Sequence, residues 1–427
     1  MNALYNRTLF FRWMLLASGW LFLLAACSSQ QPIRKPVNFA YRYNPAAHPL
    51  EISYQAYNAS DEITQVFFQL QTSGLGFLQI KDGPQSYAYI EMKIQVFQEA
   101  DTLHLLDSMT YQLKIVKQEN PIYVSNFPLQ LKDGFNYRVQ VKSTDRVNQS
   151  TDFQVVYVDR NNPESCQNFL VRHTSFLPTF SRIVPSGDTL LVESRFETND
   201  TLYMRFSSAQ PVWNNQPFGA SRNAGVSFWP DTVFKHPSSH QTKIVLEKEG
   251  IYQINTSYSL QSGVQLVATE PHFPAFKTAE AMIGPMKYLL TGREFRDLEK
   301  SANPKRALDS LWLSLNPDMA RAKELIRIYY NRAETANKLF SLSCEGWASD
   351  RGMIYLIFGP PRTVLLAEGE ERWIYGDTNL PSLDFIFVKS PDKGFGFDYV
   401  LIRQEMYKSS WYQAVDTWRN GRVYSIF

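Results

Sequence analysis

The fold of the C-terminal part depends on the stretch GWASDRGMIYLIFGPP at residues 346–361, which we call the signature stretch. Gly346 allows the chain to leave a preceding helix in a left-handed or strained conformation, and Trp347 can then bury a large apolar face. Ser349 is a cap residue whose hydroxyl can bond neighbouring backbone amides. The apolar run at residues 353–358 predicts a strand, which ends at Gly-Pro-Pro because proline lacks an amide donor.

The polar residues of the signature stretch have two interpretations. In the structural one, Asp350 bonds backbone amides, and Arg351 pairs with Asp350 or with an acid on the last helix. In the functional one, Trp347, Asp350 and Arg351 form the floor of a groove for a peptide or glycan, since aromatic and charged residues are common at recognition surfaces. We favour the structural interpretation. The candidate residues are Gly346, Trp347, Ser349, Asp350, Arg351, Gly352, Gly359 and Pro360.

Helical periodicity precedes the signature stretch, and strand patterns follow it. A stripe that includes Ala322, Tyr329 and Phe340 recurs at spacings of three or four residues, while charged residues fill the other face. The patterns predict helices at residues 282–300, 304–315 and 318–340, strands at 372–375, 383–389 and 397–402, and a last helix at 405–419. We divide this part into a helical segment, residues 275–345, and a small α+β domain, residues 346–427.

Two blocks of alternating apolar residues lie upstream, at residues 49–159 and 160–274. Alternation with period two indicates half-buried strands, and about seven fit the first block, which suits a β-sandwich. In each block a glycine precedes a tyrosine, Tyr137 or Tyr252, at the start of a late strand, as in the tyrosine corner of immunoglobulin-like folds. We therefore expect a multidomain, mainly β chain with two immunoglobulin-like β-sandwiches ahead of the helical segment.

The signature stretch resembles that of the GWxTD domain family of bacterial envelope proteins, over about residues 280–402. Ser349 stands where the family usually has threonine, but the hydroxyl and its hydrogen-bonding role are kept. Leu315 lies where the family tends to place a charged residue, which weakens any ion pair inferred for that helix. The resemblance implies no reaction, because the family has none established. Other positions that match the family are Trp312, Tyr330, Arg332, Asn337, Phe340, Trp373 and Tyr375.

The composition excludes some classes of function. The chain has 427 residues, with 43 Lys or Arg and 41 Asp or Glu, and a formal net charge of +2. A nucleic-acid-binding protein usually has a basic excess or a concentrated basic tract, so no nucleic-acid partner is expected. The hydrophobic fraction of 44% and the aromatic fraction of 14% indicate a globular protein with sizeable cores.

Residues 1–26 are predicted to be a lipoprotein signal peptide. They contain Arg7 and Arg12, no acidic residue, and an apolar run at residues 13–26 that is short for a spanning helix. The sequence LAAC at residues 24–27 matches the bacterial lipobox, in which Cys27 is the site of lipid attachment. The alternative is an ordinary cleaved signal peptide, which would leave Cys27 as a thiol.

An acylated Cys27 predicts attachment to a membrane. Ser28 follows it where an aspartate would suggest inner-membrane retention, so we expect the outer membrane. No acidic run follows, which favours the periplasmic face over the cell surface. The mature chain is formally neutral, so acyl chains rather than a polybasic patch must supply the binding energy. Residues 27–48 lack apolar periodicity and are expected to be a tether.

The remaining cysteines and the closely spaced histidines indicate neither a disulfide nor a metal site. Cys166 and Cys344 are more easily explained as small core residues than as a disulfide. His236 and His240 are separated by Pro-Ser-Ser, which disfavours the helix that a metal site would need. No metal site and no cofactor is therefore predicted.

The expected function is that of a non-enzymatic scaffold that binds an envelope protein partner. The alternative is a carbohydrate-binding or carbohydrate-processing lipoprotein, in which Trp213, Trp229 and Trp347 would stack on sugars. A further rival is a hydrolase that uses Asp350 with an acid from residues 368–371, although that acidic loop is better explained as a solvated turn. Its acids are Glu368, Glu370 and Glu371.

Overall fold

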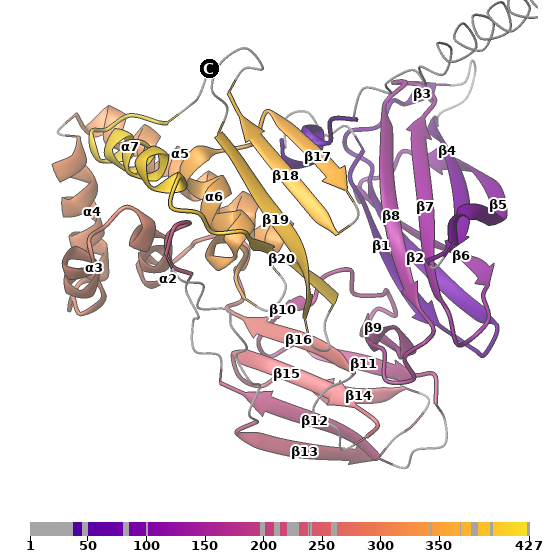
Figure 1. Ribbon diagram of the computed structural model, residues 1–427. Coiled ribbons are helices and arrows are strands. Elements are labelled where there is room, and N and C mark those ends of the chain that lie inside the picture. The colour runs from indigo at the N-terminus through magenta and orange to yellow at the C-terminus, as the bar shows by residue number, and fades with distance from the viewer. Residues whose placement is uncertain are drawn as a thin grey trace, which may run out of the picture. The chain divides into compact units, whose positions relative to one another are not determined.

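The structure is a computed structural model, and it describes most of the chain after residue 36 (Figure 1). The described residues are 37–44, 50–79, 85–99, 101–196, 201–208, 214–219, 230–237, 239, 241–257, 263–316, 318–341, 344–367, 369–376, 383–392 and 396–424. The predicted signal peptide and Cys27 lie outside them, as do Trp213, Trp229, His240 and Glu368. Within these ranges no helix is long and apolar enough to cross a bilayer.

The first β-block is a sandwich of two antiparallel sheets. One sheet has the order β1-β2-β6, with β1 Ile52–Asn58, β2 Ile63–Gln71 and β6 Ile122–Gln130. The other has the order β3-β4-β7-β8, with β3 Leu78–Gln79, β4 Ser86–Gln98, β7 Asn136–Asp145 and β8 Thr151–Asp159, and β5 Asp101–Val116 also pairs with β4. Alternate side chains from both sheets, such as Phe68 and Val139, share one core, which confirms the prediction from alternation.

The second β-block is also a sandwich of two sheets, antiparallel except where β10 pairs with β16 in parallel. Its larger sheet has the order β10-β16-β15-β12-β13, with β10 Ile183–Pro185, β16 Val264–Thr269, β15 Gly250–Asn255, β12 Thr201–Ser207 and β13 Thr232–Pro237. Its smaller sheet has the order β14-β11-β9, with β14 Thr242–Val245, β11 Thr189–Ser194 and β9 Phe169–His173. Side chains from both sheets again meet in one core.

Both sandwiches contain the predicted tyrosine corner. The hydroxyl of Tyr137 accepts a hydrogen bond from the Lys132 amide at 3.1 Å and donates one to the Lys132 carbonyl at 2.9 Å. Tyr252 makes the same pair of bonds with Lys248, both at 2.9 Å. Each hydroxyl satisfies two backbone groups of the preceding turn, as expected for immunoglobulin-like sandwiches.

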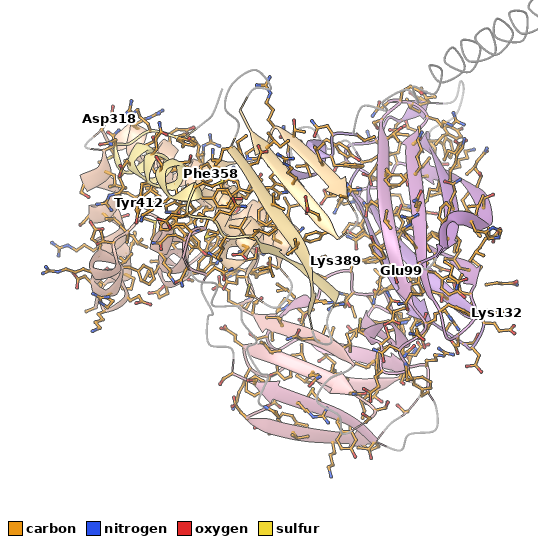
Figure 2. The ribbon with its side chains drawn as sticks, in the orientation of Figure 1. Glu99, Lys132, Asp318, Phe358, Lys389 and Tyr412 are labelled. Carbon is orange, nitrogen blue, oxygen red and sulfur yellow. The ribbon has the colours of Figure 1, made fainter. Side chains whose placement is uncertain are left out.

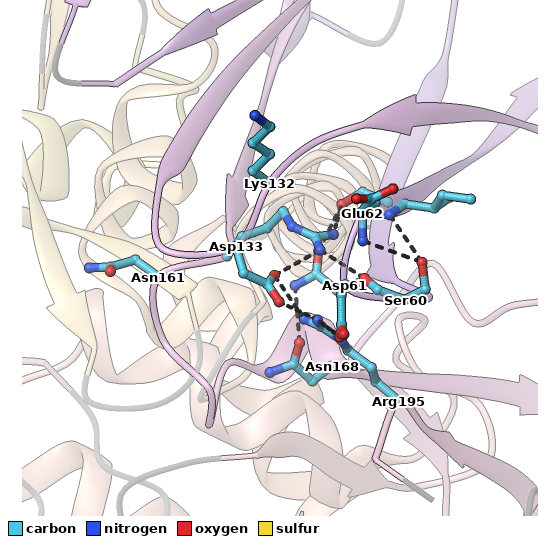
Figure 3. Close-up of polar contacts among 12 residues, drawn as sticks. Ser60, Asp61, Glu62, Lys132, Asp133, Asn161, Asn168 and Arg195 are labelled. Carbon is cyan, nitrogen blue, oxygen red and sulfur yellow. Dashed lines mark hydrogen bonds and ion pairs between the residues drawn. The ribbon is translucent and has the colours of Figure 1, made fainter.

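An ionic cluster with buried arginines and exposed carboxylates connects the two sandwiches (Figure 3). The Arg160 side chain is fully buried, and it lies 2.7 Å from Asp133 and donates to the Thr64 hydroxyl at 2.8 Å. Arg195, at the end of β11, donates to the same Asp133 and lies 2.7 Å from Asp61. Asp133 of the first block accepts both Arg195 of the second block and Arg160 at the boundary between the blocks, so the linkage is specific in geometry.

The C-terminal part joins helices to a four-stranded antiparallel sheet. The helices are α2 Ala279–Ile283, η3 Gly284–Tyr288, α3 Gly292–Glu299, α4 Pro304–Leu315, α5 Met319–Phe340, η4 Gly346–Ala348, α6 Asp350–Phe358 and α7 Tyr407–Arg419. The sheet has the order β17-β18-β19-β20, with β17 Thr363–Ala367, β18 Glu370–Tyr375, β19 Leu383–Asp392 and β20 Gly396–Leu401. Helices α6 and α7 pack on it through Phe358, Phe385 and Tyr407 (Figure 1).

Two predictions for this part are wrong. The helix expected at residues 282–300 is broken, since Pro285 begins a 3₁₀ turn and Thr291 caps a new helix with a capping box to Glu294. The strand expected at residues 353–358 is helix α6. Every residue from Met353 to Phe358 is buried, so the run has neither the polar face of a surface helix nor strand alternation. A short, wholly buried apolar run cannot be assigned from periodicity alone.

The predicted tether is partly structured. Residues Ala40–Tyr43 form the 3₁₀ helix η1, whose Ala40 and Tyr43 belong to the C-terminal core. The Phe39 amide donates to the Val364 carbonyl of β17 at 2.9 Å, and the Tyr355 hydroxyl of α6 donates to the Tyr43 carbonyl at 3.0 Å. The chain therefore contacts its last structural part before it enters the first sandwich.

Acid is expected to weaken the link between α3 and α7. Arg419 donates to both carboxylate oxygens of Glu294, at 2.8 and 3.0 Å. These bonds, with help from Thr291, lower the pKa of Glu294 from 4.5 to about 2. Because the folded-state pKa is the lower one, this stabilisation is present above pH 4.5 and is lost as the pH falls toward about 2.

We therefore expect Glu294→Gln to flatten the dependence of the melting temperature on pH between about 5 and about 2. Circular dichroism measures this dependence. Glu299→Gln, on the exposed end of the same helix, should retain the wild-type slope. Identical slopes for the wild type and Glu294→Gln would contradict the prediction.

Candidate functional site

Two glycines of the signature stretch allow backbones to approach closely. A Cβ at Gly346 would lie 1.9 Å from the Ala336 carbonyl oxygen of α5, and one at Gly352 would lie 1.8 Å from the Gly346 carbonyl oxygen. Neither glycine is left-handed. The expectation of a left-handed exit at Gly346 is therefore wrong, and close packing of η4 between α5 and α6 is what requires glycine.

Ser349 caps helix α6, as expected. Its hydroxyl accepts a hydrogen bond from the Gly352 amide at 3.0 Å and donates one to the Gly346 carbonyl at 2.7 Å. Asp350 follows in the first turn, where a negative charge interacts favourably with the helix dipole. Both bonds need only a hydroxyl, so serine can replace the threonine usual in the family that the sequence resembles.

Trp347 is buried, with 3% of its surface exposed. Its ring lies against η3, where a Cβ at Gly284 would be 2.7 Å from the indole, and it packs edge-on against Tyr288 at 6.1 Å. Its amide donates to the Asn337 side chain of α5 at 3.2 Å. Trp347 therefore joins three helical elements, and this position supports the structural interpretation over an exposed recognition groove.

Asp350 pairs with Arg403 rather than with Arg351. One carboxylate oxygen accepts the Leu401 amide at 2.9 Å, and the other accepts the Arg403 guanidinium. Arg403 also donates to the backbone carbonyls of Asn215 at 2.8 Å and of Gln216. The pair thus fixes residues 214–219, which come from between β12 and β13, onto the signature stretch.

Arg351 forms a second ion pair, with Glu371 of β18. Its guanidinium donates to Glu371 at 3.4 Å and lies over the rings of Phe340 at 5.0 Å and Tyr399 at 4.6 Å. The predictions that Arg351 pairs with Asp350 or with the last helix, and that Glu371 lies in a solvated turn, are wrong. Glu371 is 1% exposed, because strand β18 turns its carboxylate into the core.

Glu371 also holds the segment that precedes the first sandwich. It accepts hydrogen bonds from the Trp373 indole at 3.0 Å and from the Tyr43 hydroxyl of η1. Burial, and then the charge of Glu371, raise the pKa of Tyr43, so the phenol stays protonated as a donor. The Tyr43 ring packs on Trp373 at 4.9 Å and on Phe340 at 5.6 Å.

The end of α6 is closed by Arg332 of α5. Its guanidinium donates to the carbonyls of Leu356 at 3.3 Å and Ile357 at 3.1 Å, where a cation suits the helix dipole. Burial lowers the pKa of Arg332 to about 10. Gly359 is left-handed, with φ +84°, and a Cβ there would lie 2.8 Å from Arg332. Pro360 follows on the surface, after the helix has ended.

Comparison with known families agrees with this architecture. Residues 250–420 match the family model described as the GWxTD domain. The chain contains a GWxTD domain. The match begins at β15 and ends after α7, so it extends beyond the 280–402 expected from the sequence and includes the last strands of the second sandwich.

Other comparisons add no argument about the GWxTD domain. The chain is similar to a calcium binding mutant of Bacteroides uniformis beta-glucuronidase 2, with 15% identity, a TM-score of 0.17, and coverage of 29% of this chain and 14% of that chain. It is also similar to a Bacteroides fragilis protein described as a beta-galactosidase, with 12% identity, a TM-score of 0.18, and coverage of 35% and 19%. Such low TM-scores carry no inference. No curated protein matches the sequence.

Asp350 and Glu371 are held as structural carboxylates. Asp350 and Glu371 are 2% and 1% exposed, and each accepts hydrogen bonds from an arginine and from a second donor. A carboxylate held in this way is poorly placed to attack a substrate or to transfer a proton. No cluster of three metal-binding side chains occurs among the described residues, and no disulfide joins Cys166 and Cys344.

Sequence reasoning missed Tyr43, Arg403 and residues 214–219. Tyr43 and Glu371 are separated by 328 positions, and Arg403 and Asp350 by 53. A local pattern cannot report such pairings. The sequence did contain one chemical clue. Asp350 and Glu371 lie beside aromatic residues that are expected to be buried, and a buried carboxylate needs a cation as its partner.

Proposed function

We propose that the protein is a lipid-anchored scaffold of the bacterial envelope, attached to the outer membrane through Cys27 and facing the periplasm. The lipobox at residues 24–27 supports the anchor, and a formally neutral mature chain needs acyl chains for membrane binding. The scaffold role rests on the ion pairs that Asp350 and Arg351 of the signature stretch form.

One observation carries this proposal: the two buried ion pairs of the GWxTD domain clamp distant segments of the chain. The Arg351–Glu371 pair holds η1 through Tyr43, and the Asp350–Arg403 pair holds residues 214–219. Breaking a buried pair is costly, so these contacts keep the segments in fixed geometry. Such rigidity suits a protein that presents a constant surface to a partner.

The clamp on η1 also limits how far the GWxTD domain can lie from the lipid. Residues 28–38 separate Cys27 from the first clamped residue, Phe39, and when fully extended they span at most about 40 Å. On the proposed anchor, the GWxTD domain is therefore held close to the membrane, although it is last in the sequence.

The anchor is tested by replacing its thiol. Cys27→Ser is expected to abolish incorporation of labelled palmitate and to leave an unprocessed precursor, because the lipoprotein peptidase acts on the modified cysteine. Cys166→Ser is the matched control, and it should be labelled like the wild type. A labelled Cys27→Ser protein, or an unlabelled wild type, would overturn the anchor.

The scaffold role is tested by co-purification from detergent-solubilised membranes. A stable envelope protein that accompanies the wild type supports the proposal. The carbohydrate-binding alternative requires no such partner. Recovery of the protein alone would count against the scaffold role whatever the outcome of the palmitate experiment.

A further inference from the structure

A shallow, open groove lies at one end of the first sandwich, away from the clamps of the GWxTD domain. Its volume is about 340 Å³, and its lining is formed by the end of β4, the turn before β7 and the segment after β8. The lining residues are Gln98, Glu99, Gly134, Phe135, Asn136 and Asn161. This volume falls within the range of small-molecule sites, and the scaffold function does not use it.

Phe135 provides an exposed and rigid ring in this groove. Its side chain belongs to a residue that is 44% exposed, and the ring packs edge-on against Tyr137 at 6.4 Å. The Gly134 amide donates to the Arg160 carbonyl at 3.0 Å, and the Arg160 amide donates to the Phe135 carbonyl at 3.2 Å. With the tyrosine corner at Lys132 closing the same turn, the backbone that carries the ring is ordered before any ligand arrives, which reduces the entropy cost of binding.

The polar lining consists of three amides and one carboxylate. Gln98 and Asn161 each offer both donors and an acceptor, as sugar hydroxyls do, and Glu99 offers acceptors. Asn136 offers its amide donors, because its side-chain oxygen is buried. Figure 3 shows the Asn161 side chain pointing away from the ionic cluster at Asp133. The charges of Lys389 and Glu99, both labelled in Figure 2, interact with each other. The Lys389 ammonium lies 3.7 Å from the centre of the Tyr157 ring. Among the described residues that line the groove there is no Lys or Arg, so its chemistry suits a neutral polyol rather than an anion.

We propose that this groove binds a neutral saccharide, with one pyranose ring on Phe135 and its hydroxyls bonded to the amides of Gln98, Asn136 and Asn161. The inference goes beyond the scaffold function and does not depend on it. It also moves the carbohydrate interpretation away from Trp347, which is buried. An aromatic face with a few converging polar groups is what fixes the orientation of a small ligand.

A neighbouring hollow suits a different ligand, an apolar peptide side chain. It has a volume of about 300 Å³ and shares Gln98 and Phe135 with the groove. Its walls add Leu106 and Leu129 beside polar side chains such as Gln130. An apolar peptide side chain can pack on these leucines. A sugar gains less there, because leucine side chains form no hydrogen bonds with hydroxyls. The effects of Leu106→Ala and Asn161→Ala therefore separate the two kinds of ligand.

The test is saturation-transfer NMR on the detergent-solubilised full chain with N,N′-diacetylchitobiose, cellobiose and maltose. We expect at least one of them to bind with a Kd on the order of 1 mM. Phe135→Ala should weaken binding by about tenfold or more, and Asn161→Ala by about threefold or more. Phe176→Ala removes another exposed phenylalanine, 60% exposed and outside the groove, and should bind like the wild type.

The outcomes are decisive in either direction. Absence of transfer to all three sugars overturns the proposal, as does an equal effect of Phe135→Ala and Phe176→Ala. A loss with Leu106→Ala that Asn161→Ala does not share also overturns it, in favour of an apolar peptide. Asn161 is exposed, so its variant keeps the test valid even if Phe135→Ala unfolds the turn.

Discussion

Gly346→Ala is expected to lower the free energy of unfolding of the C-terminal core by about 3 kcal/mol or more, the upper end of what overpacking costs. The new methyl carbon would lie 1.9 Å from the Ala336 carbonyl oxygen and 2.5 Å from its carbon. Both atoms belong to the backbone of α5, so no side chain can rotate to make room, and η4 must separate from the helix.

The measurement is thermal unfolding followed by tryptophan fluorescence. The tryptophans of the described residues, 312, 347, 373, 411 and 418, all belong to this core. Gly292→Ala is the matched control. A Cβ there meets only the Arg296 side chain, at 3.5 Å, so stability should change by less than about 1 kcal/mol. Equal melting temperatures for the two variants would refute the close-packing explanation.

Trp347→Ala is expected to cost a similar amount, about 3–5 kcal/mol, for the opposite reason. It removes a buried ring and leaves a cavity between η3 and α5, whose walls are held by other contacts such as the Tyr329 hydroxyl on the Pro285 carbonyl at 2.7 Å. The surrounding structure cannot collapse far into this space, so the full cavity penalty applies.

Thermal unfolding and a pull-down on the same variant separate packing from recognition. If Trp347 is a packing residue, the variant melts early or is degraded. Tyr412→Ala, a change at a residue of α7 that is 47% exposed, should stay near the wild type, as surface substitutions usually do. An unchanged melting curve for Trp347→Ala, together with loss of a co-purifying partner, would restore the recognition interpretation.

Sequence reasoning succeeded where one face of an element meets water. Helices α4 and α5 agree with the predicted residues 304–315 and 318–340 to within one residue. Their apolar stripes alternate with charged positions, and Pro304 and Asp318 mark their starts through proline geometry and an N-cap. The strands of the first sandwich were similarly evident, since alternation is strict where a single face is buried.

It failed where burial is complete or where partners are remote. Helix α6 is buried on all sides, so its sequence lacks the polar face that would have identified it. Strand β17 was missed because only one of its five residues, Val364, is fully buried. Glu371 looked like part of an acidic turn because neither Arg351 nor Tyr43 is adjacent in sequence.

The docking of η1 has a consequence for the order in which the protein can mature. In the order of the chain, Tyr43 comes before both sandwiches, while Glu371 and Trp373 come after both. Each sandwich can close on its own residues as it emerges, but the C-terminal core must wait for both ends of the chain to meet. Until then, the aromatic surfaces of Phe340 and Trp373 stay uncovered where Tyr43 will lie. The final folding step of the GWxTD domain therefore requires that η1 is free to dock on Phe340 and Trp373.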